Sequence, residues 1–135
     1  MGKTASSGMS VLLDKMATAM KEFEGWTVGS RSYRNNNPGN LKFAGQAGAI
    51  GQDDEGHAIF DSYDSGWAAL IHQLSMYFNG TSSVIQPENC LYTLYSHYAE
   101  ANSVEYAEYV GQALGVDPSL SLAQIQAFYT GVSNV

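Results

Sequence analysis

The chain has 135 residues, of which 44% are hydrophobic, and its 13 acidic and 6 basic residues give a formal net charge of −7. This size and apolar content suffice for one domain with a buried core. The acidic balance lacks the basic surface that binds nucleic acid or an anionic membrane. No apolar run approaches the ~20 residues that cross a bilayer, and residues 1–9 lack the apolar stretch of a signal peptide, so we expect neither membrane insertion nor secretion by a signal peptide.

Residues 1–9 are mostly small and polar, which predicts a flexible lead before a single domain over residues 10–135. A first helix is predicted from about Val11 to Glu24, with Ser10 as its N-cap and Gly25 just past its end. Its apolar residues recur at helical spacing and form one stripe: Leu12, Leu13, Met16, Met20 and Phe23.

Glu24 stands at the end of this helix, four residues after Met20 and eight after Met16, so it projects from the apolar stripe. Apolar neighbours disfavour the charged form of a carboxyl, so we expect the pKa of Glu24 to be raised, which suits a general acid. The same spacing also fits a solvated carboxylate at the edge of the stripe that merely ends a helix. Spacing alone leaves both interpretations open.

A run of asparagines follows the helix, and within it Pro38 and Gly39 predict a β-turn. Amide side chains held at a fixed turn can bond the hydroxyl and N-acetyl groups of a sugar, which makes Asn36, Asn37 and Asn40 candidate binding residues. Each of these amides also fits a role in bonding its own backbone and shaping the turn.

A small β lobe is predicted at about residues 40–60, with short strands at 41–43 and 58–60 and a glycine-rich loop between them. The loop carries Asp53, Asp54 and Glu55. Their spacing matches no metal motif, so we predict neither a metal nor a cofactor. A solvated loop tip is one interpretation of this trio; a carboxylate that faces Glu24 across a cleft is the other.

The rest of the chain has helical spacing in four segments, at about 64–78, 91–98, 103–114 and 122–128. The expected fold class is therefore α+β and mainly helical. Tyrosines are frequent, and although most should pack in the core, Tyr33 and Tyr98 are candidates for stacking on a sugar ring.

Three stretches carry a resemblance to a known superfamily: Glu24-Gly25, the run Asn-Asn-Pro-Gly-Asn-Leu ending at Leu41, and Ala58-Ile59-Phe60 followed by Tyr63 and Gly66-Trp67. Together they resemble phage-associated members of the lysozyme-like superfamily, which includes lytic transglycosylases, endolysins and virion-associated peptidoglycan hydrolases. The asparagine run, similar to a motif of bacterial glucosaminidases, is the most specific element. The resemblance covers residues 9–114.

The resemblance implies a helical body and a small β lobe on either side of a glycan cleft. It implies that Glu24 protonates the β-1,4 glycosidic oxygen between N-acetylmuramic acid and N-acetylglucosamine. Asn36, Asn37 and Asn40 would shape or line the cleft. The chain departs from hydrolysing phage lysozymes in one respect, because no acidic residue lies between Glu24 and Asp53.

This departure favours a lytic transglycosylase, in which one glutamate is acid and then base. A muramidase or glucosaminidase that uses a second carboxylate of the β lobe is the alternative. A non-catalytic glycan-binding or structural virion module shares the fold and is a third possibility. The expected partners are bacterial peptidoglycan and other phage virion or tail proteins. The expected localisation is synthesis in the bacterial cytoplasm, then association with the virion or release at lysis.

Overall fold

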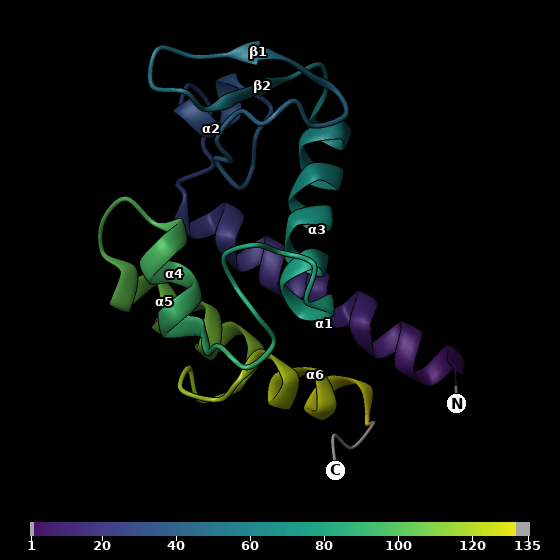
Figure 1. The fold of residues 1–135 in the computed structure, drawn as a ribbon. Coiled ribbons are helices and arrows are strands. Elements are labelled where there is room, and N and C mark those ends of the chain that lie inside the picture. Colours follow the sequence, from purple (N-terminus) through teal and green to yellow (C-terminus); the bar gives the residue numbers. More distant parts are fainter. Residues whose placement is uncertain (1, 132–135) are drawn as a thin grey trace. The chain divides into compact units, whose positions relative to one another are not determined.

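A computed structural model of the chain describes residues 2–131, and its fold is drawn in Figure 1. Over these residues the fold is α+β and mainly helical, which confirms the predicted class. The helices are α1 (Gly2–Phe23), α2 (Arg31–Arg34), α3 (Tyr63–Asn79), α4 (Leu91–Tyr98), α5 (Ser103–Leu114) and α6 (Leu122–Thr130), and the strands are β1 (Ala49–Gln52) and β2 (Ala58–Phe60). No helix in this part of the chain is both long and apolar enough to cross a membrane.

The chain divides into two compact units. The first comprises the described residues of Met1–Ala19 and Leu74–Val135, and the second is Met20–Gln73. Helices α1 and α3 therefore each contribute residues to both units.

In the first unit, α1 begins at Gly2, so the predicted start at Val11 and the predicted N-cap Ser10 are wrong. Within this earlier part of the helix Gly8 is closely packed, because a Cβ there would collide with the backbone of Tyr129 and Thr130. Part of the predicted lead is thus packed helix. The apolar stripe is confirmed at Leu12, Met16 and Met20, which are fully buried, whereas Leu13 and Phe23 are half-buried.

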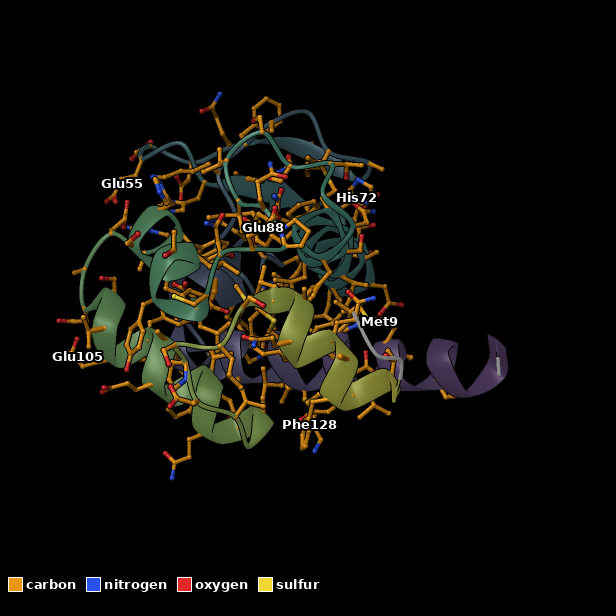
Figure 2. All side chains as sticks on the ribbon, turned by 60° about the horizontal axis from the view of Figure 1, so that its bottom comes forward. Met9, Glu55, His72, Glu88, Glu105 and Phe128 are labelled. Carbon is orange, nitrogen blue, oxygen red and sulfur yellow. The ribbon has the colours of Figure 1, made fainter. Side chains whose placement is uncertain are left out.

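The later helices of the first unit follow the predicted boundaries closely. Helix α5 ends at Gly115, whose positive φ of 72° closes the helix. Helix α6 begins with a capping box between Ser121 and Gln124. Phe128 of α6 projects outward with 68% of its surface exposed (Figure 2).

In the second unit, β1 and β2 form an antiparallel hairpin with a bulge between Ala49 and Gly51 (Figure 1). The predicted strand at 41–43 is wrong: within this segment Lys42 forms an isolated bridge with His57, the residue before β2. The first strand of the hairpin is β1, in the segment predicted as a loop. Strand β1 contains a glycine and an exposed Ile50, so its sequence does not show the alternation of apolar and polar residues by which a strand is predicted.

Helix α3 packs its first turn against the asparagine run. Its N-cap is Ser62, whose hydroxyl accepts a hydrogen bond from the N–H of Ser65 at 3.1 Å. Gly66 has no room for a side chain, because a Cβ there would collide with the carbonyl oxygen of Asn36. Glycine at this position lets the helix approach the turn.

Candidate active site

The end of α1 places Glu24 through a Schellman motif. The N–H of Gly25 bonds the carbonyl of Glu22 at 3.0 Å, and the N–H of Trp26 bonds the carbonyl of Lys21 at 3.3 Å. Gly25 takes the left-handed conformation that this motif needs, with φ +80°. Glu24 is therefore the C-cap residue, half-buried, with its own N–H bonded to the carbonyl of Met20 at 2.8 Å.

The same motif folds Trp26 back onto the last turn of α1 and starts an aromatic cluster. The Lys21 ammonium lies 5.0 Å from the centre of the Trp26 ring and 4.8 Å from that of Tyr63, and it donates to the Tyr63 hydroxyl at 3.1 Å. Tyr33 tilts against Trp26 at 5.2 Å between ring centres, and Tyr63 stacks on Trp67 at 6.2 Å. With 42% of its surface exposed, Tyr33 offers a ring to solvent at the edge of this aromatic cluster.

Asn37 holds the polar corner together from inside. It is fully buried, its Nδ2 donates to the carbonyls of Leu41 and Ala58 at 2.9 Å each, and its Oδ1 accepts from the N–H of Leu41 at 2.9 Å. These bonds join the asparagine run to β2. Asn37 thus shapes the corner from a position that solvent does not reach.

Asn36 also bonds the hairpin, because its Nδ2 donates to the carbonyl of Phe60 at 3.1 Å. Its backbone is left-handed, with φ 52°, a conformation that asparagine tolerates better than most residues. The amide is half-buried and is committed to the backbone, which is the turn-shaping role that the sequence left open.

Asn40 connects the asparagine turn to Glu24. Its N–H closes the turn on the carbonyl of Asn37 at 2.9 Å, and its φ of 53° is again left-handed. From there its Nδ2 donates to Oε1 of Glu24 at 3.4 Å. The predicted acid and the predicted turn, which are far apart in the sequence, are therefore in direct contact.

Asp53 is tied into the hairpin turn. Its Oδ1 accepts from the N–H groups of Glu55 and His57 at 2.9 Å each, its Oδ2 accepts from Nδ2 of Asn35 at 3.0 Å, and Arg31 lies 3.6 Å away. Partial burial by itself would raise the pKa of this carboxyl. The bonds from His57, Asn35 and Glu55 outweigh it and hold the pKa of Asp53 far below its ordinary value.

The other candidate residues have different surroundings. Glu55 lies at the hairpin turn (Figure 2), where its carboxylate pairs with Arg31 at 2.6 Å, and Asp54 is exposed. Tyr98 belongs to the first unit, where its ring packs edge-on to Tyr95 at 6.0 Å and to Tyr106 at 6.1 Å. Across residues 2–131, no three His, Cys, Asp or Glu side chains gather in a way that suits a metal ion.

Sequence reasoning missed three residues of this site: Lys21, Trp26 and Tyr63. Lys21 and Trp26 could have been identified from their spacing around Gly25. A Schellman motif brings the residue after its glycine against the residue four positions before that glycine, and here these are Trp26 and Lys21. No local signal identifies Tyr63, which reaches the cluster from α3.

The second unit thus brings together one half-buried carboxyl, an amide that donates to it, and an aromatic cluster with an exposed ring. A carboxyl in this setting can give and take a proton, and an aromatic ring can stack on the apolar face of a sugar. Comparisons of the chain with protein-family models, with curated proteins and with solved structures give no match.

Proposed function

We propose that this protein cleaves the glycan strands of bacterial peptidoglycan, with Glu24 as the catalytic acid and then base, in a lysozyme-like fold. The contact between Glu24 and Asn40 is the observation that carries the proposal. It joins the acid to the polar corner, in which Asn36 and Asn37 hold the turn to the hairpin and Asn40 places an amide at the carboxyl. The partners that we propose are peptidoglycan and the other proteins of a phage particle that delivers the enzyme to the wall.

The position of Glu24 at the carboxyl end of α1 supports a role as acid. The last carbonyls of a helix present partial negative charge, which disfavours a further negative charge nearby and helps a carboxyl to keep its proton. The half-buried setting acts in the same direction, because it removes part of the water that would solvate a carboxylate.

The proposed reaction is a lytic transglycosylation. Glu24 gives its proton to the glycosidic oxygen as the bond from that oxygen to C1 of N-acetylmuramic acid breaks. The carboxylate then takes the proton of the sugar's own 6-hydroxyl as that oxygen bonds to C1. The products are a 1,6-anhydro-muramic end and a free 4-hydroxyl on the leaving sugar. Glu24 is protonated again and no water is consumed.

The bonding of Asp53 supports a single-carboxylate mechanism. A hydrolase needs a second carboxylate that is free to attack C1 or to take a proton from water. Both Asp53 oxygens already accept hydrogen bonds, and its depressed pKa makes it a poor base. Glu55 is paired with Arg31. Hydrolysis would therefore fall to Asp54, which is exposed to solvent.

A zymogram on purified peptidoglycan tests the proposal. The parent chain should clear the gel, and Glu24→Gln should lower clearing at least ~10²-fold, because the amide cannot donate a proton as the acid does. Glu22→Gln is the matched control: Glu22 is exposed on the same helix, and this variant should clear like the parent. Equal clearing by Glu24→Gln and parent removes Glu24 from its role, and no clearing by a folded parent favours a non-catalytic glycan-binding module.

Mass spectrometry of the released fragments tests the reaction type. Anhydro-muramic ends are expected from the transglycosylation described above. Reducing muramic or glucosamine ends would instead identify a hydrolase and would direct attention to Asp54 as the second carboxylate.

A further inference from the structure

We propose that Asn40 is the positioning residue of Glu24 and that its side-chain amide turns over with the Glu24 proton, donating to the carboxylate and accepting from the carboxylic acid. This inference rests on the proposed function of Glu24 and adds how one carboxyl can serve as acid and base without moving. The two ends of the Asn40 side-chain amide differ in their hydrogen-bond partners.

One end of the amide has a partner and the other has none. Nδ2 donates to Oε1 of Glu24 at 3.4 Å, a long bond of the kind that tightens when a site closes on substrate. Oδ1 is buried, yet no hydrogen bond reaches it within the described part of the chain. A buried acceptor without a donor costs free energy, so a role for it is expected.

Among the described residues, the hydrogen-bond partner of this amide is Glu24, which Nδ2 contacts. The two amide ends are similar in size, and half a rotation of the side-chain amide exchanges their positions. A Glu24 carboxylate can only accept, so it selects Nδ2. A protonated Glu24 also carries an O–H donor, for which the buried and unpartnered Oδ1 is the available acceptor on this amide. Either protonation state therefore finds a partner in the same place.

Hydrogen bonds hold the backbone at Asn40 in place, so rotation of its side-chain amide does not shift the Glu24 carboxyl. The turn bond to Asn37 at 2.9 Å fixes the backbone, and Asn37 is itself locked to β2. The left-handed φ of 53° aims the side chain of Asn40, and asparagine and glycine tolerate this conformation best.

Several charged groups of the second unit lie on α1 and around the hairpin. On α1, Lys21 is held between the Trp26 and Tyr63 rings, and its positive charge favours the Glu24 carboxylate. Glu22 on the same helix is exposed, which weakens its influence on Glu24. On the side of the hairpin, Arg31 is paired with Asp53 and Glu55, and Lys42 donates to the Glu55 carbonyl at 3.2 Å.

An NMR titration tests the proposal whether or not the chain clears peptidoglycan. The Glu24 carboxyl carbon, followed in ¹³C-labelled protein, reports its protonation. The ¹H and ¹⁵N signals of the Asn40 amide should move with pH at the same midpoint. In Glu24→Gln the Asn40 signals should stay constant over that range. The amides of Asn36 and Asn37, which donate to carbonyls, are internal controls and should stay constant in both proteins.

Two substitutions of Asn40 sharpen the test. Asn40→Asp replaces the donor by a second negative charge and should raise the Glu24 midpoint by about one pH unit. Asn40→Gly keeps the left-handed backbone, removes the amide and identifies the Asn40 signals by their loss. The matched control is Asn36→Gly, which has the same backbone geometry, with φ 52°, and should leave the Glu24 midpoint unchanged.

The proposal is overturned if the Asn40 signals do not change over the pH range in which Glu24 titrates. It is also overturned if the titration midpoint of Glu24 in Asn40→Asp is equal to or below its midpoint in the parent. Failure of the proposed function has a separate signature: a parent chain that titrates as described but clears no peptidoglycan. If the parent does clear it, Asn40→Gly should lower kcat by roughly 10-fold or more and leave KM within about twofold, because positioning acts on the reacting carboxyl rather than on sugar binding.

Discussion

At Asp53 and Glu24 the chain places two carboxyls in opposite environments. Asp53 accepts two backbone N–H bonds and one from Asn35, which stabilise its charge. Glu24 caps the carboxyl end of a helix and accepts a long bond from Asn40. Hydrogen bonds to the charged form hold the pKa of Asp53 low, so under the proposed function Asp53 is structural and Glu24 is the group that transfers a proton.

The bonding of Asp53 predicts a pH-dependent stability. Because its folded pKa is depressed, its contribution is full above the ordinary value of 3.8 and is lost as the pH falls toward the folded value. Asp53→Asn should therefore cost about 1–2 kcal/mol at neutral pH and less at about pH 3. Urea unfolding at both pH values measures this. An equal loss of unfolding free energy at both pH values would show that Asp53 stabilises the turn through its shape and not through its charge.

Only part of the site was predictable at this scale. Glu24 and Asn40 were identified because an end-of-helix carboxyl and a proline–glycine turn are local features. The direct bond between them was not, since it depends on how the turn packs in space. The fit of Asp53 to a turn also depends on a distant partner, Asn35.

At the scale of elements, α3 meets the asparagine run through a glycine. In Gly66→Ala the added methyl group would collide with the Asn36 carbonyl oxygen, a backbone atom that cannot swing aside. We expect a loss of at least about 2 kcal/mol, which exceeds the ~1 kcal/mol that alanine gains in a helix. Thermal unfolding measures it. The control Gly51→Ala adds a methyl group where nothing lies within 4 Å and should change stability far less.

The amino-terminal turns of α1 carry a second such contact. Gly8→Ala would place a methyl group against the backbone at Tyr129 and Thr130, so the expected loss of about 1–3 kcal/mol again outweighs the gain in helix propensity. Ser7→Ala, at an exposed position of the same turn, is the control. Denaturant midpoints of the two variants compare them. A Gly8→Ala variant more stable than Ser7→Ala would contradict the packing of this segment.

At the scale of the whole molecule, the net charge of −7 bears on how the protein meets its proposed substrate. Peptidoglycan carries carboxylates of its own, and like charges repel until salt screens them. Under the proposed function, KM should fall by roughly twofold or more as NaCl rises from about 20 to about 200 mM. Steady-state clearing rates measure this, and amidated peptidoglycan, whose carboxyls are neutral, is the control. A KM that rises with salt would point to an attractive patch instead.

The sequence by itself determined the features that depend on neighbouring residues. Apolar spacing and end signals placed α3 to α6 and the stop of α1 at Gly25, because a helix is specified by side chains three and four positions apart and by its caps. The tertiary structure alone decided the rest: the early start of α1, the true first strand and the bond from Asn40 to Glu24. Each of these features depends on groups that lie far apart in the chain and come into contact only when it folds. The local periodicity of the sequence does not encode such long-range contacts.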